Sequence, residues 1–247
     1  MNFTKEIWAV IPARSGSKSI KNKNIKSFSG KPLIAHTIII AKKLKKVKKI
    51  IFSSDSQKYY NIAKKYGKIE FHKRSKKNSL DSSTDLDLFK EIISYFKYKK
   101  VNLPEFLIHL RPTTPLRKKK HLDKAIKILI SKKKSYDSLR SLTHMSQTSF
   151  KTFRIVDGKI SGLIKKDFNI DKFNLPRKKY ESTYEANGII DIYKTKNILS
   201  GSLSGNRSFP YVIDHINSDI NTFKDFKIFE LINKKKWIKK LLQCQKM

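Results

Sequence analysis

Short apolar runs alternate with longer amphipathic segments over the first half of the chain. The apolar runs have the length of buried strands and lie at 7–11, 49–53, 69–72, 105–110 and around 138–142. The segments between them repeat apolar residues at helical spacing and predict helices at 32–44, at 56–66, at about 85–96 and up to about 132. This βαβ order predicts an α/β fold with a mostly parallel sheet flanked by helices.

The pattern breaks between residues 145 and 184. This stretch is polar and holds only short strand-like pieces, such as Thr152–Val156. Regular structure resumes with strands at 188–193 and 211–213 and a helix from about 222 to 242. We therefore expect residues 1–247 to form a single domain in which 145–184 is an excursion from the sheet, either a lid or a dimerisation arm.

Polar residues mark the start of several predicted helices. Ser56 is placed to cap the helix that follows it, and the run 81–85 (Asp-Ser-Ser-Thr-Asp) is typical of a helix start. His36 and His109 adjoin apolar segments, so we interpret them as packing residues and not as metal ligands.

Composition narrows the class of protein. A chain of 247 residues with 38% hydrophobic residues can bury a real core. Its longest nearly apolar stretch, 33–41, is too short to span a bilayer, and the N-terminal apolar run is typical of a strand and not of a signal peptide. The single cysteine, Cys244, excludes a disulfide framework. These features predict a soluble, cytoplasmic protein that does not act at a membrane.

The formal net charge of +36 raises the possibility of a nucleic-acid binder. The lysines are spread over the whole chain, however, and no known nucleic-acid-binding motif accompanies them, so we expect no nucleic-acid partner. Only eight of the 56 basic residues are arginines. Because arginine is suited to a planar, bidentate grip on phosphate or carboxylate, their positions are more informative than those of the lysines.

The loop after the first predicted strand carries the clearest chemical signal. Residues 13–18 read Ala-Arg-Ser-Gly-Ser-Lys, and Lys23-Asn24 follows shortly afterwards. Small residues after a buried strand let backbone N–H groups and cations point at one place, which suits a polyphosphate. The loop matches neither the P-loop nor the dinucleotide-binding pattern, so its position must support the interpretation.

Four segments, in this order and spacing, resemble the acylneuraminate cytidylyltransferases, the CMP-sialic acid synthetases. They are 11–18 with Lys23-Asn24, 109–117 (His-Leu-Arg-Pro-Thr-Thr-Pro-Leu-Arg), 186–188 (Ala-Asn-Gly), and 218–222 (Ser-Asp-Ile-Asn-Thr) with Asp225-Phe226. The resemblance covers essentially the whole chain. It implies a Rossmann-like nucleotide-diphospho-sugar transferase fold, CTP and an acidic nine-carbon sugar as substrates, Mg²⁺ as cofactor and a homodimer. The sugar's anomeric hydroxyl would attack the α-phosphorus and pyrophosphate would leave.

The resemblance also implies roles for particular residues. It assigns catalytic roles to Arg14, Lys23 and Asp219, and metal ligation to Asp219 and Asn221. The residues implied at the nucleotide are Ala13, Arg14, Ser15, Gly16, Ser17, Lys18, Asn24 and Arg74. Those implied at the sugar are Arg111, Lys151, Arg177 and Asn187, with Lys151 and Arg177 acting across the dimer.

Two positions depart from the family pattern. Arg111 stands where the sialic acid enzymes usually have Gln, which suggests a sugar with different substituents. Asn221 stands where the family has a second metal-binding Asp. Alternation along an extended segment would keep residues 219 and 221 on one face of the chain. Because Mg²⁺ prefers charged oxygen ligands, we expect a weakened Mg²⁺ site, assisted by Asp225 or by the triphosphate. The alternatives are therefore activation of legionaminic, pseudaminic or 3-deoxy-octulosonic acid, and a catalytically impaired nucleotide-binding homologue.

Overall fold

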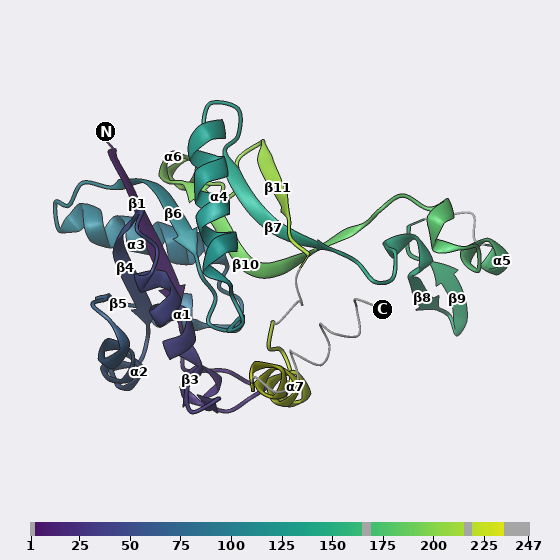
Figure 1. Cartoon of the computed structure of the whole chain (residues 1–247), viewed down its shortest axis with the longest axis horizontal. Helices are drawn as coiled ribbons and strands as arrows, with labels where there is room; N and C mark the ends of the chain where they lie inside the picture. Colours follow the sequence, from purple (N-terminus) through teal and green to yellow (C-terminus); the bar gives the residue numbers. More distant parts are fainter. Residues whose placement is uncertain (1–2, 165–168, 215–218, 235–247) are drawn as a thin grey trace.

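A seven-stranded sheet forms the centre of the computed structural model, which describes residues 3–164, 169–214 and 219–234 (Figure 1). The strand order is β11-β7-β10-β6-β1-β4-β5, and β10 runs antiparallel to both of its neighbours while the other pairs are parallel. The bounds are β1 Thr4–Pro12, β4 Val47–Ser54, β5 Glu70–Lys73, β6 Pro104–His109, β7 Ser138–His144, β10 Tyr184–Lys194 and β11 Ser208–Val212. The predicted α/β fold with a mostly parallel sheet is confirmed.

Helices cover both faces of this sheet. One core cluster unites α1 (Leu33–Lys42), α2 (Gln57–Ala63) and α4 (Lys119–Lys132) with Ala9 and Ile11 of β1. The second unites α3 (Asp85–Tyr98) and α6 (Thr195–Leu199) with Trp8 and Val10. Alternate residues of β1 thus face opposite layers, as the pleat of a strand requires.

The helix starts follow the predicted cap chemistry. The Ser56 side chain accepts a hydrogen bond from Tyr59 N–H at the start of α2, and Thr84 forms a capping box with Asp87 at the start of α3. At the last helix, α7 (Phe223–Asn233), Thr222 and Asp225 form a second capping box. The predicted continuation of this helix to 242 lies outside the described residues.

The segment 145–184 leaves the sheet along the ends of β7 and β10. It carries the hairpin β8 (Phe153–Val156) and β9 (Lys159–Gly162), the short helix α5 (Ile170–Phe173) and two 3₁₀ turns, η4 (Ser149–Lys151) and η5 (Arg177–Lys179). Figure 1 shows β8, β9 and α5 far to one side of the sheet. We call residues 145–184 the arm.

The remaining elements are short. A two-stranded hairpin, β2 (Ser27–Phe28) and β3 (Lys31–Pro32), precedes α1, and three further 3₁₀ turns are η1 (Lys23–Ile25), η2 (Lys64–Tyr66) and η3 (Lys77–Ser79). None of the helices in the described ranges has both the length and the apolar character that crossing a bilayer demands.

Candidate active site

A cavity of about 450 Å³ opens where β1, β5 and β6 end. Strands that run parallel finish at one edge of a sheet, so the loops after them gather there. Among the predicted site residues, seven line the cavity: Arg14, Ser17, Lys18, Lys23, Asn24, Arg74 and Arg111. The structure therefore brings together residues that are almost a hundred positions apart in the chain.

The loop after β1 is anchored by hydrogen bonds on both sides. Ser15 donates its N–H (2.8 Å) and its hydroxyl (2.6 Å) to the carboxylate of Asp55, which follows β4. The Asn24 amide donates to the carbonyl oxygen of Arg14 at 3.0 Å. Ala13, Ser15 and Gly16, which were predicted at the nucleotide, do not line the cavity. Ser15 and Asn24 thus shape the loop, whereas Arg14, Ser17 and Lys18 face the open space.

Two cations of this loop share one carboxylate. An Arg14 Nη atom lies 2.5 Å from Asp81 Oδ1, and Lys18 Nζ lies 2.6 Å from Asp81 Oδ2. Hydrogen bonds from these two cations lower the pKa of Asp81. Asp81 itself lines the cavity, so an anion already lies between the two cations that were predicted to hold phosphates.

Lys23 connects the start of the chain to the motif at 219–222. Its Nζ donates to the carbonyl oxygen of Ile220 at 3.1 Å, and the Ile220 N–H donates to Thr113 at 2.8 Å. Burial lowers the pKa of Lys23 and Arg14 adds to that effect, while the nearby carboxylate of Asp219 opposes it. Arg14 and Asp219, the other two residues predicted to be catalytic, therefore both lie within electrostatic reach of Lys23.

The predicted metal ligands differ in burial. Asp219 is half-buried and Asn221 is exposed. The carboxylate of Asp225, expected to assist them, accepts the N–H groups of Asn221 (3.1 Å) and Thr222 (2.7 Å) and caps α7. In the described part of the chain no three His, Cys, Asp or Glu side chains gather as a metal cluster.

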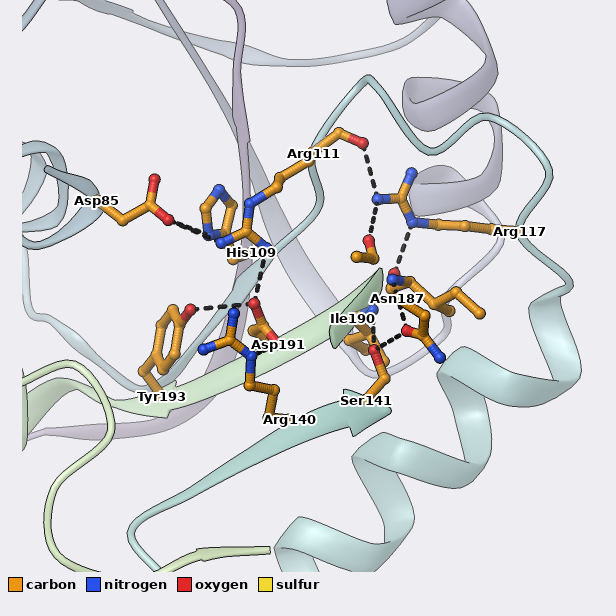
Figure 2. A network of polar contacts seen from close by, with 12 residues as sticks. Asp85, His109, Arg111, Arg117, Arg140, Ser141, Asn187, Ile190, Asp191 and Tyr193 are labelled. Carbon is orange, nitrogen blue, oxygen red and sulfur yellow. Dashed lines mark hydrogen bonds and ion pairs between the residues drawn. The ribbon is translucent and has the colours of Figure 1, made fainter. Parts of the chain in front are cut away.

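Arg111 lies at the cavity wall, but two carboxylates bind its guanidinium. One Nη atom donates to Asp191 and the other to Asp85, each at 2.7 Å (Figure 2). Burial alone would lower the pKa of Arg111, but these two carboxylates outweigh it and raise the pKa. Tyr193 also donates to Asp191, at 3.3 Å. The predicted sugar-facing arginine thus carries a charge that the protein already balances.

Arg74 and His109 complete the inner wall of the cavity. Arg74 is almost fully buried, its Nε has no hydrogen-bond partner, and burial lowers its pKa. His109 packs edge-to-face on Phe89, which confirms its predicted packing role. Burial, helped by the nearby Arg111 charge, lowers the pKa of His109 to about 3, so its ring is neutral near pH 7.

The buried side chain of Arg117 holds the loop after β6 in place through hydrogen bonds. It donates to the backbone carbonyl of Arg111 at 2.7 Å (Figure 2). It also donates to the carbonyls of Ile189 (2.6 Å), Gly188 (2.8 Å) and Thr114, and to the hydroxyl of Thr37 at 3.2 Å. Burial, with the repulsion of Arg111, lowers its pKa to about 9. The motif 109–117 therefore contains one arginine at the cavity and one that holds the loop.

Two residues predicted at the sugar, Asn187 and Lys151, do not line this cavity. Asn187 is fully buried, and its side-chain oxygen accepts from the Ser141 hydroxyl (2.7 Å) and Ile189 N–H (3.1 Å). Lys151 lies on the arm, with Nζ 5.7 Å from the ring centre of Tyr180. Arg177 begins η5, and its side chain is outside the described residues. Within one subunit, Asn187 thus supports the strands, and the arm keeps Lys151 away from the cavity.

The sequence interpretation missed the roles of Asp81 and Asp85. Both fall in the run 81–85, which was assigned to helix-start chemistry; Thr84 is indeed the cap, but the two aspartates line the cavity. Two signals were available: this acidic run precedes a helix next to the arginine-bearing strand ends, and the family resemblance implies that one residue of this segment lies near the nucleotide. Asp191 had no such signal, because it is one polar residue within the apolar run 189–193.

The sequence model of the family described as cytidylyltransferase matches residues 8–228. The chain belongs to the cytidylyltransferase family. It is 32% identical to an N-acylneuraminate cytidylyltransferase of Escherichia coli O18:K1:H7 over 94% of this chain and 53% of that protein. It is 36% identical to a CMP-N,N'-diacetyllegionaminic acid synthase of Legionella pneumophila over 49% of this chain and 52% of that protein. The chain thus covers only about half the length of these two relatives.

A solved structure supports the same fold. The CMP:2-keto-3-deoxy-manno-octonic acid synthetase complexed with CTP superposes with a TM-score of 0.65 at 13% identity, covering 92% of this chain and 98% of that one. This cytidylyltransferase therefore has the predicted Rossmann-like nucleotidyltransferase fold.

Proposed function

We propose that this cytidylyltransferase transfers CMP from CTP to the anomeric hydroxyl of a sialic-acid-like nonulosonic acid. The observation that supports this best is the convergence of Arg14, Lys18 and Lys23 on one cavity at the end of β1. The sugar oxygen forms a bond to the α-phosphorus, the bond from that phosphorus to the bridging oxygen of pyrophosphate breaks, and the hydroxyl proton is released. Phosphoryl-transfer chemistry of this kind depends on positioning and charge more than on covalent groups of the protein.

Each cation has a distinct part in this scheme. Arg14 and Lys18 are exposed enough to bind the phosphates that leave as pyrophosphate. Lys23 is held by the Ile220 carbonyl and is more buried, so its charge is less screened and acts more strongly on the reacting phosphate. Arg74, with an unpartnered buried Nε, is placed to donate to the nucleotide from the β5 side.

The donor set at 219–221 fits Mg²⁺. The Asp219 carboxylate and the Asn221 amide both offer hard oxygen ligands, and Mg²⁺ is usually held by one or two carboxylates together with substrate phosphates. When bound, the ion neutralises charge on phosphate oxygens.

Replacing Asn221 by Asp tests whether this chain is a catalytically impaired homologue. A large gain in turnover at limiting Mg²⁺ would identify a weakened metal site. An unchanged, normal rate would show that one carboxylate is enough.

The arm favours a homodimer. It exposes apolar side chains that one subunit leaves uncovered, including Ile155 at 78% exposure and Ile160 at 51%. A second copy seated on the arm would bury them and bring Lys151 and Arg177 to the sugar in the other subunit's cavity. In this proposal residues 1–247 act as one cytidylyltransferase domain. Because CTP is a cytoplasmic metabolite, we place its activity in the cytoplasm.

A related acidic sugar is the second candidate substrate. The balanced charge of Arg111, between Asp85 and Asp191, offers no free cation to a sugar carboxylate and favours a sugar with different polar substituents. The names of the two relatives and of the solved structure contain N-acylneuraminate, N,N'-diacetyllegionaminic acid and 2-keto-3-deoxy-manno-octonic acid. Legionaminic, pseudaminic and 3-deoxy-octulosonic acids are thus the alternatives to test.

A pyrophosphate-release assay over four nucleoside triphosphates and a panel of acidic sugars tests the proposal. We expect release with CTP and Mg²⁺ in the presence of at least one nonulosonic acid. Turnover with another nucleotide or another class of sugar, and none with CTP and nonulosonic acids, would contradict it. The nucleic-acid alternative is tested separately, because it requires steeply salt-dependent binding to single or double strands.

A further inference from the structure

Asp81 lies between the two cations of the loop after β1, Arg14 and Lys18. Its two carboxylate oxygens divide between Arg14 (2.5 Å) and Lys18 (2.6 Å), so a single anion bridges both cations. A phosphate group presents the same chemistry, oxygens that carry negative charge at hydrogen-bond distance from an arginine and a lysine. Asp81 and a triphosphate cannot bind these two side chains in the same way at the same time.

The surroundings of Asp81 allow it to leave. Its side chain is 42% exposed, and the neighbouring Leu80 is 59% exposed. The segment that carries it is fixed at its two ends, where Ser75 binds Glu91 and Thr84 caps α3. Ion pairs this open to water contribute little to the stability of a structure. A ligand with several charges therefore has enough binding energy to displace the carboxylate.

We propose that Asp81 is an internal counter-anion that the triphosphate displaces on binding and that returns to Arg14 and Lys18 as pyrophosphate leaves. This inference rests on the proposed function, because it requires the polyphosphate to bind at these two cations. Asp81 then weakens the binding of substrate and product polyphosphates by the same factor. In return, pyrophosphate does not remain trapped on two unbalanced cations, and inhibition by this product is reduced.

The variant Asp81→Asn keeps the shape of the side chain and removes its charge. The matched control is Glu70→Gln, which removes one carboxylate from an ion pair with Lys49 (2.9 Å) at the start of β5, outside the cavity lining. Both variants change the net charge by the same amount. Asp81 lies in an exposed loop, and thermal melting checks that each variant remains folded.

Calorimetric titrations of CTP, pyrophosphate and cytidine into wild type and both variants test the proposal. For Asp81→Asn we expect CTP and pyrophosphate to bind about 3- to 10-fold more tightly and cytidine to bind as it does to wild type. We expect the control to match wild type and the gain to shrink at high salt. In turnover assays KM for CTP should fall and pyrophosphate should inhibit at lower concentration.

Three results would overturn the inference. Unchanged or weaker CTP binding by Asp81→Asn would show that Asp81 does not compete, and weaker binding would assign it the opposite role of positioning Arg14. An equal gain in affinity for CTP and pyrophosphate in the Glu70→Gln control would show that the effect arises from net charge alone. If wild type binds CTP no more tightly than cytidine and does not bind pyrophosphate, the cations do not hold a polyphosphate, and the proposed function fails together with the inference.

Discussion

The loop after β1 and the loop after β6 end at the same edge of the sheet but use arginine in opposite ways. In the first loop, Arg14 faces the cavity with one third of its side chain exposed, and its partner is a half-exposed carboxylate. In the second, Arg111 lies between two carboxylates and Arg117 binds four backbone carbonyls. An exposed carboxylate partner leaves Arg14 available to a ligand, whereas Asp191, with 3% of its side chain exposed, and the backbone carbonyls around Arg117 make the arginines of the second loop part of the fold. Variants in the two loops should therefore separate loss of activity from loss of stability.

The largest loss of stability is expected when Arg117, in the loop after β6, is replaced. Arg117→Ala leaves buried carbonyl oxygens without donors, and we expect the free energy of unfolding to fall by about 3–5 kcal/mol. Arg117→Lys should recover little, because an ammonium group cannot reproduce the planar fork. Urea unfolding measures both, with the exposed Arg154→Ala as control. A urea unfolding curve of Arg117→Ala that matches this control would contradict the structural role of Arg117.

The first loop should show the reverse behaviour. For Arg14→Ala we expect kcat/KM for CTP to fall by about 10²- to 10³-fold, the usual loss when one charge-stabilising donor is removed. Stability should change little, since the Arg14 side chain is partly exposed. Arg207→Ala, an exposed arginine at the start of β11, serves as the control. Full activity of Arg14→Ala in a steady-state assay would exclude the loop as the phosphate site.

Acid should destabilise the protein through two buried neutral histidines at the edge of the sheet where the cavity opens. The pKa of His72, at the end of β5, is lowered by burial to about 4, and that of His109 to about 3. Between pH 6.5 and 5 the unfolded chain binds protons that the folded chain excludes. The free energy of unfolding should thus fall with pH by about 1.4 kcal/mol per pH unit for each histidine.

Urea unfolding at several pH values checks this slope. His109→Gln should reduce it by about 1.4 kcal/mol per pH unit, since the titration of this one histidine is removed. The exposed His144→Gln should leave it unchanged. Constant stability of wild type from pH 6.5 to 5 would contradict the neutral, buried state of these rings.

A smaller effect should follow from crowding the contact between β10 and the loop after β6. Gly188 has φ +64°, and a Cβ there would lie 2.8 Å from the Thr114 hydroxyl oxygen. Gly188→Ala should therefore reduce the free energy of unfolding by about 1–2 kcal/mol. Gly158→Ala has a similar φ of +72° with nothing within 4 Å of the added atom, so it isolates the backbone strain. Equal losses in the two variants would show that the Thr114 contact is unimportant.

The sequence predicted most of the fold because its signals are local. Apolar runs such as 7–11 and 49–53 correspond to β1 and β4, and Ser56 caps the helix that its position predicted. The cavity was also partly predictable, since the loops that follow parallel strands must meet at one edge. Arg14, Lys18 and Arg74 all line it.

The pairing inside the site could not be predicted in the same way. Arg111 binds Asp191, 80 residues later, and nothing near either residue in the sequence indicates the contact. The same holds for Arg117, whose acceptors are backbone carbonyls with no sequence signature. Asp81 was assigned to a helix start because its true partners, Arg14 and Lys18, precede it by more than sixty residues.

A crystal structure of the wild-type protein with CTP and Mg²⁺ tests the central claim most directly. It should place the triphosphate within hydrogen-bond distance of Arg14 and Lys18, with Asp81 displaced and Arg111 still bound to Asp85 and Asp191. A triphosphate held by Arg111, with Asp81 still on Arg14 and Lys18, would contradict the account.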